Sequence, residues 1–178
     1  WDAAPGADVS SHGSGRFEFG EDHDAGAGLV QTLDLHFDLL EKGDAAGARK
    51  DAEAWAGFLE GQAAAAKTPE QRAVFDSHRL SAYLELKQPE RAIPMLQASE
   101  KDLPDDYNPP SRLAVAYMAM KKPDEALAAS NRALPKVVGP RRVQVLQRRS
   151  DIFAAKGDAA ASREALEQAL ASAEALPA

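Results

Sequence analysis

Carboxylate and imidazole side chains, which are ligands of divalent cations, gather near the start of the chain. Asp22, His23 and Asp24 are consecutive, and Glu18 and Glu21 come just before them. A metal-binding or ligand-binding accessory protein would use this acidic arm. The arm has no helical spacing and no second histidine nearby, so a solvated acidic loop is the favoured interpretation and no metal ligand is assigned.

No other residues of the chain have the spacing of a known catalytic motif. The chain has no cysteine, which excludes disulfides, thiolate zinc sites and cysteine nucleophiles. A Gly-x-Ser-x-Gly elbow, a phosphate-binding loop, a dinucleotide fingerprint and a His-Glu-x-x-His pair do not occur. We therefore expect a protein that is not an enzyme, with no catalytic residue and no cofactor.

Charge and hydropathy disfavour two classes of partner. A formal net charge of −7 at pH 7 argues against binding to nucleic acid or to anionic lipid. No apolar run reaches the length of a membrane span, so no direct membrane insertion is expected. The composition is that of a soluble globular protein. A chain starting at Trp1 is consistent with an exported bacterial protein that has lost its signal, or with a trimmed domain, and the compartment stays open.

Five cations lie close together in the second half of the chain. Arg141 and Arg148 are seven residues apart, as are Arg142 and Arg149, so each pair recurs on one face of a helix. Together with Lys136 they could meet an acidic partner or a phosphate group. A solvated face balanced by nearby acids is the favoured interpretation. The acidic arm of the chain itself is an alternative source of counter-charge.

Abundant alanine and few β-branched residues favour helices over strands. Residues 1–27 contain five glycines and few large apolar side chains, so we expect an irregular N-terminal arm. From residue 28 onward the apolar spacing is helical, which predicts one helical domain over 28–178. The expected helices span residues 28–41, 44–66, 68–87, 89–101, 111–121, 123–134, 141–156 and 158–176.

Two helix starts are marked clearly in the sequence. Thr68-Pro69-Glu70-Gln71 offers a threonine cap, a proline in the first turn and a glutamine placed for a capping box. In the helix expected at 89–101, Pro94 falls in the first turns, where it is tolerated but is expected to distort the start.

An internal similarity relates the helix pairs to one another. The sequence Lys-Gln-Pro-Glu-Arg-Ala at 87–92 recurs as Lys-Lys-Pro-Asp-Glu-Ala at 121–126, a shift of 34 residues. Tyr83 and Tyr117 each lie nine residues before the alanine that ends the motif. A small residue in the second helix lets the first helix approach closely, and the aromatic side chain fills the space beside it.

A period of 34 built from two helices and a tight turn is similar to that of tetratricopeptide repeats. The resemblance implies an all-α fold, an α-solenoid of about four antiparallel helical hairpins, because one hairpin cannot bury its faces alone. The last unit has Ser162 at the small-residue position. About ten extra residues follow the first unit, and we expect them in a helix lengthened around 62–67. The units are centred on residues 29–62, 73–106, 107–140 and 143–176.

In this family the first helix of each pair lines a concave groove that holds a peptide, a helix or another domain. The family's chaperone-tail binders hold a C-terminal carboxylate there with asparagine and lysine side chains. The asparagine place is taken here by other residues, so no carboxylate clamp is expected; they are Phe37, Ser81, Val115 and Asp151. The resemblance assigns the partner-binding groove to Leu33, Phe37, Leu40, Ser81, Leu84, Val115, Met118, Gln147 and Asp151.

The expected function is therefore that of an adaptor or assembly factor, which binds a protein or peptide partner in this groove. The groove is expected to be apolar towards the N-terminus, where it would receive an amphipathic helix or an apolar segment, and polar towards the C-terminus. An equal alternative is that its apolar residues are covered by the chain's own arm through Trp1, Phe17 or Phe19.

A self-associating structural module is the other alternative. The last helix has an apolar face with no capping helix after it, and a second copy of the chain could cover that face to form a homodimer. The residues that would pair are Leu166, Leu170 and Ala173.

Overall fold

The computed structural model describes residues 45–176, and within that range every regular element is a helix. The predicted helix at 28–41 and the arm at 1–27 lie outside the described residues. The helices are α2 (Ala45–Ala65), α3 (Pro69–Ala73), α4 (Asp76–Glu85), the 3₁₀ helix η1 (Pro89–Arg91), α5 (Ala92–Asp102), α6 (Asn108–Ala119), α7 (Pro123–Ala133), α8 (Pro140–Ala155) and α9 (Ala159–Glu174).

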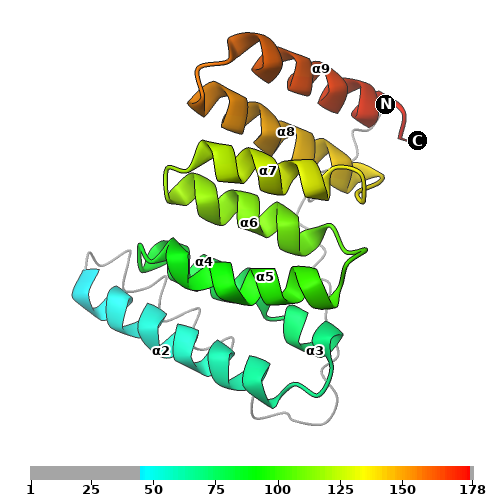
Figure 1. The fold of residues 1–178 in the computed structure, drawn as a ribbon. Coiled ribbons are helices and arrows are strands. Elements are labelled where there is room, and N and C mark those ends of the chain that lie inside the picture. Colours follow the sequence, from blue (N-terminus) through cyan, green and yellow to red (C-terminus); the bar gives the residue numbers. More distant parts are fainter. Residues whose placement is uncertain (1–44, 177–178) are drawn as a thin grey trace, which may run out of the picture.

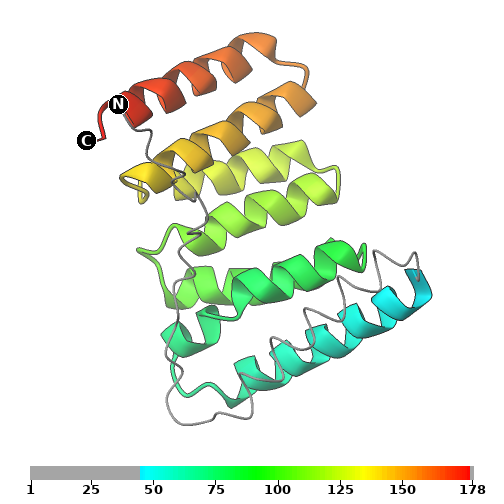
Figure 2. The same cartoon turned by 180° about the vertical axis from the view of Figure 1, so that it is seen from behind.

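The helices are stacked one upon another in chain order from α2 to α9 (Figures 1 and 2). α4 packs against α5, α6 against α7 and α8 against α9, and each pair is an antiparallel hairpin. Successive hairpins pack through α5 with α6 and through α7 with α8, and α2 packs against α4. This is the α-solenoid that the sequence predicts, because each hairpin buries its apolar faces against its neighbours.

Each of the three complete hairpins in residues 45–176 turns at a residue in the left-handed conformation. Lys87 and Lys121 both have φ 58°, and Gly157 has φ 77°. The amide of the following residue donates to the carbonyl of an aromatic residue five positions earlier, at N···O distances of 2.8 to 2.9 Å. This is the Schellman motif, which satisfies the last carbonyls of a helix. The turn that repeats in the sequence is thus a repeated backbone hydrogen-bond pattern.

Small residues allow the two helices of a hairpin to approach each other. Ala92 and Ala126, the two alanines that are 34 residues apart, have no exposed surface, and Tyr83 is 2% exposed. In the last hairpin the hydroxyl of Ser162 lies 2.8 Å from that of Ser150, so the polar group that replaces alanine has a partner. The packing confirms the role that the spacing assigns to the small residue.

The helix predicted at 68–87 is two helices. Its start is as expected, since the Thr68 side chain accepts a hydrogen bond from the Gln71 amide at 3.3 Å. The chain then breaks at Val74 and Phe75, between α3 and α4. α3 packs on α2 and α5, while α4 packs on α2 and α6, and one straight helix could not follow both directions. The extra residues after the first unit therefore form α3 as well as the end of α2.

Proline shapes the starts of two helices, one as predicted and one not. Pro94 has no N–H to donate to the carbonyl four residues earlier, and the turn before Ala92 is the 3₁₀ helix η1, the distortion that was expected. α6 begins at Asn108 rather than at Ser111, because its two prolines occupy the first turn, where no intrahelical donor is required. The predicted loop at 102–110 is therefore shorter, at 103–107.

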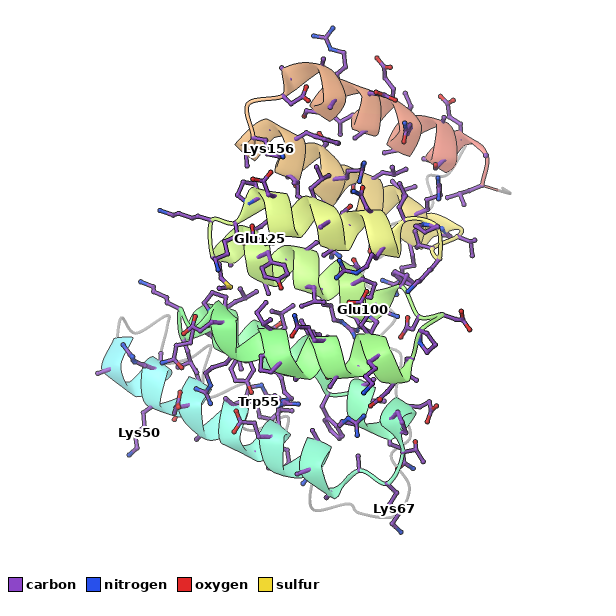
Figure 3. The ribbon with its side chains drawn as sticks, viewed as in Figure 1. Lys50, Trp55, Lys67, Glu100, Glu125 and Lys156 are labelled. Carbon is purple, nitrogen blue, oxygen red and sulfur yellow. The ribbon has the colours of Figure 1, made fainter. Side chains whose placement is uncertain are left out.

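Ion pairs join neighbouring units along the outer edge of the stack. The Arg132 guanidinium donates to both carboxylate oxygens of Glu100, at 2.7 and 3.0 Å, and so links α7 to α5. The Lys156 ammonium forms an ion pair with one carboxylate oxygen of Asp124, and this pair links the end of α8 to α7. In Figure 3, Glu100 lies between α5 and α7, and Trp55 points from α2 into the stack. Because such exposed pairs contribute about 0–1 kcal/mol, the apolar core carries most of the stability.

We expect Ala126→Leu to lower the free energy of unfolding by about 1–3 kcal/mol, because a larger side chain has no room at the crossing of α6 and α7. Urea unfolding followed by circular dichroism measures this. Ala128→Leu on the exposed side of α7 is the control, and its effect should stay within about 0.5 kcal/mol. Equal losses in the two variants would contradict the close-packing account.

Candidate protein-binding groove

The first helices of the hairpins, α4, α6 and α8, pack on one another in sequence and form one face of the solenoid. Two hollows lie on this face, each with a volume of about 300 Å³. They share Val115 and Arg148, so they are continuous parts of one groove. We call them the arginine hollow and the apolar hollow.

The arginine hollow lies over the N-terminal halves of α6 and α8 and along α4. Polar side chains surround it, and the structure places no carboxylate in its lining. Its cations are Arg112 of α6 and Arg141 and Arg148 of α8. The lining residues are Ser77, Leu80, Ser81, Leu84, Tyr107, Asn108, Ser111, Arg112, Val115, Arg141, Gln144, Val145 and Arg148.

The apolar hollow lies over the C-terminal halves of α6 and α8. Ala114, Val115 and Met118 come from α6, and Ile152 comes from α8 beside Asp151. Val115 and Met118 are half-buried and pack against the core from the groove side. A segment lying across both hollows would therefore meet cations first and apolar surface next.

Most of the predicted groove residues within the described range do line this groove. Ser81 and Leu84 line the arginine hollow, Val115 lines both hollows, and Met118 and Asp151 line the apolar one. Gln147 is exposed on α8 but lines neither hollow. The remaining three predicted residues lie outside the described residues; they are Leu33, Phe37 and Leu40.

The expected gradient, from apolar residues towards the N-terminus of the chain to polar ones towards the C-terminus, depends in part on Leu33, Phe37 and Leu40, which lie outside the described residues. Within residues 45–176 the polarity also changes along the helix axes. The hollow with three arginines lies towards the N-terminal ends of α6 and α8, and the hollow with most of the apolar side chains lies towards their C-terminal ends. Neighbouring first helices lie side by side, so each hollow combines residues from more than one repeat.

The predicted groove residues do not include the arginines of the groove, although Arg141 and Arg148 were identified as members of a basic cluster. Arg148 donates to the Ser111 hydroxyl at 3.2 Å, which holds it across the gap between α8 and α6. Burial lowers the pKa of Arg112, and the Asp76 carboxylate opposes that change. The available signal was the position of Arg112 next to Ser111 on the predicted groove face, together with the seven-residue spacing of Arg141 and Arg148.

The basic cluster divides between two faces of α8. Arg141 and Arg148 face the groove, whereas Arg142 donates to the Leu134 carbonyl at 3.0 Å and Arg149 donates to Asn131 at 2.6 Å. Each seven-residue pair thus shares a face, as predicted. Neither these arginines nor Lys136 forms an ion pair within 4.0 Å of a carboxylate in residues 45–176. The charge of Glu164 nevertheless acts on Arg149 and opposes the lowering of its pKa by burial, so a nearby acid is present for this member of the cluster.

Asp76 lies beneath the arginine hollow with no exposed surface, and neither of its carboxylate oxygens has a hydrogen-bond partner. Burial raises the pKa of Asp76, while the nearby Ser99 hydroxyl and the charge of Arg112 oppose the rise. The charges of Asp76 and Asp106 act on Arg112 and oppose the lowering of its pKa by burial.

The described residues contain no cluster of three or more histidine and carboxylate side chains that could hold a metal ion. The predicted acidic arm lies outside the described residues. Between residues 45 and 176, no helix is both long enough and apolar enough to cross a membrane.

Comparison with known proteins agrees with the architecture. Residues 83–149 match the tetratricopeptide repeat family, and this range contains the two hairpin turns at Lys87 and Lys121. This stretch of the chain is therefore similar to tetratricopeptide repeats. None of the curated proteins compared with it matches.

Two solved structures show the same tetratricopeptide-like fold. Both contain the nearly identical TPR-like repeats of a Podosopora anserina protein described as a kinesin light chain. One aligns with a TM-score of 0.60 at 20% identity, covering 88% of this chain and 80% of that one. A variant of the same repeats with one substitution aligns with a TM-score of 0.59 at 21% identity, covering 84% and 76%. At this identity the likeness shows the fold alone.

We expect Asp76→Asn to remove a pH-dependent loss of stability. Because the pKa of Asp76 is raised in the folded state, the parent becomes less stable as pH rises from the carboxyl's ordinary range through its raised folded value. Each unit of the rise corresponds to about 1.4 kcal/mol. Urea unfolding of both proteins at several pH values should show that the free energy of unfolding of the variant increases relative to that of the parent as pH rises. If it instead decreases relative to the parent, Asp76 is stabilised as a carboxylate by its arginine neighbours.

Proposed function

We propose that this protein, whose repeats are similar to tetratricopeptide repeats, is an adaptor or assembly factor that binds a segment of another protein in the groove of α4, α6 and α8. The observation that carries the proposal is the continuous pair of hollows, which offers charge at one end and apolar surface at the other. Peptide segments are recognised in this way, by apolar anchors with a few polar contacts that fix their direction.

The packing of the groove supports a docking role. The apolar side chains that reach it rest on a buried core, so the surface is rigid before a partner arrives. Leu113 and Ala116 of α6 have no exposed surface, and they fix the helix that presents Val115 and Met118. A preformed surface binds with a smaller loss of conformational entropy than a flexible one. Protein binding is also the general role of this family, and the finer assignment to the groove is part of the proposal.

We expect Met118→Glu to lower the affinity for a groove-bound partner at least about tenfold, because a carboxylate replaces an apolar contact. Protein captured from the native source is compared between parent and variant, and the affinity of the main species is then measured with purified components. Met120→Glu is the matched control, a half-buried methionine at the end of the same helix that lines neither hollow. Both variants must keep the helicity of the parent. Equal binding by the two variants would rule the groove out as the docking surface.

We also propose self-association through α9 as a second function, because two large apolar side chains are exposed there. Leu166 is 50% exposed and Leu170 is 60% exposed. Arg163 lies near one end of this face and Glu174 near the other. A two-fold antiparallel pairing would therefore set each arginine beside a glutamate of the second copy.

We expect a molecular mass that rises with protein concentration in analytical ultracentrifugation, and a constant monomer mass for Leu166→Glu. The introduced carboxylate would be buried without a partner in the pair. Ala171→Glu, an exposed position on another side of α9, should associate like the parent. A monomeric parent at every concentration would end this second proposal.

A further inference from the structure

We infer that the arginine hollow is the binding site of the chain's own acidic arm, the segment from Glu18 to Asp24. This inference rests on the proposed function, since it places a segment in the same groove, and it names a specific occupant. The apolar hollow beside it then remains the surface on which a partner competes or docks.

The charge of the hollow calls for an anionic ligand. Arg112, Arg141 and Arg148 converge on it from two helices, and the structure puts no carboxylate in the lining to balance them. Ser77 and Ser81 of α4 also line the hollow, and the Ser77 hydroxyl can donate to a carboxylate oxygen, whereas the Ser81 hydroxyl donates to the Ser77 carbonyl at 3.0 Å. Arginine binds carboxylates through paired hydrogen bonds, so acidic side chains are well suited to this lining.

The burial of Asp76 explains why the hollow keeps its capacity for an anion. This carboxylate is behind Arg112 and fully enclosed, and its raised pKa reflects the cost of its charge there. Arg148 donates one hydrogen bond to the neutral Ser111 hydroxyl. Arg141 is exposed and forms no ion pair among the described residues. Asp76 and Asp106 act on Arg112 through their charges, but no carboxylate lines the hollow itself, so a carboxylate from outside residues 45–176 would complete its balance of charge.

The acidic arm is complementary to the arginine hollow in charge, and the residues that join the arm to α2 are numerous enough to let it reach the hollow. It carries four carboxylates within seven residues, at Glu18, Glu21, Asp22 and Asp24. Residues 25–44 join it to α2 and span about 65 Å if extended, or about 40 Å with a helix over 28–41. From α2 to α8 there are three helix-to-helix steps of about 8–10 Å each, so the hollow is within reach.

The absence of cysteine allows a direct test in the full chain. Gly20→Cys places a thiol in the arm, and Gln144→Cys places one in the arginine hollow, where the glutamine is exposed. The control pair joins Gly20→Cys with Gln97→Cys, an exposed glutamine on α5, which is nearer to α2 in the stack. A randomly moving arm would reach Gln97 at least as often as Gln144.

We expect the hollow pair to form an intramolecular disulfide at least about tenfold faster than the control pair in oxidised glutathione, followed by intact mass and peptide mapping. Adding Arg141→Gln and Arg148→Gln should reduce the rate to that of the control pair. Adding Lys67→Gln and Lys101→Gln instead, which removes two exposed cations elsewhere, should leave the rate unchanged. High salt should slow the reaction of the hollow pair as the charges are screened.

Three outcomes would overturn the inference. Equal rates in the two cysteine pairs would show that the arm has no preference for the hollow. A fast rate that survives loss of both arginines would mean that other contacts hold the arm. Disulfides between molecules, seen as dimers on non-reducing gels, would assign the hollow to a second copy. None of these results depends on a captured partner, so they separate this inference from the Met118→Glu test of the proposed function.

Discussion

The close approach of two helices at a small residue is the constraint on which the rest of this structure depends. Ala92 and Ala126 sit at helix crossings with no exposed surface, and Ser162 takes their place only because Ser150 satisfies its hydroxyl. Dispersion contacts and burial of apolar area grow as the helices approach, and a larger side chain would hold them apart. Each hairpin then presents a flat face on which the next one stacks.

The same packing builds the groove and gives it two chemical characters. The second helices α5 and α7 carry Ala92 and Ala126 and are joined by the ion pair of Arg132 with Glu100, while α4, α6 and α8 form the face with the hollows. Arginines at the N-terminal ends of α6 and α8 converge because the helices lie side by side in the same direction. Arg141 lies in the first turn of α8, where the positive end of the helix dipole adds to the potential that attracts an anion.

Much of the fold was predicted from the sequence because repetition makes local signals agree. The 34-residue shift, the proline turns and the threonine cap at Thr68 each predicted an element that the structure contains. Boundaries were less certain where proline acts, since Pro94 and the prolines at the start of α6 changed the first turns. The break between α3 and α4 has no sequence marker, because it follows from which neighbours each half must pack against.

The sequence by itself determined the repeat, the hairpins and the face that lines the groove, since these depend on contacts between residues near in the chain. It placed Ser81, Leu84, Val115, Met118 and Asp151 on that face, and all five line the hollows. Only the tertiary structure decided what the groove offers a ligand. Arg112 and Arg148 belong to different repeats and meet across α6 and α8, with a buried carboxylate beneath them. Such convergence depends on the distance between helices of different repeats and on how far their side chains extend. Neither can be deduced from the sequence of one repeat.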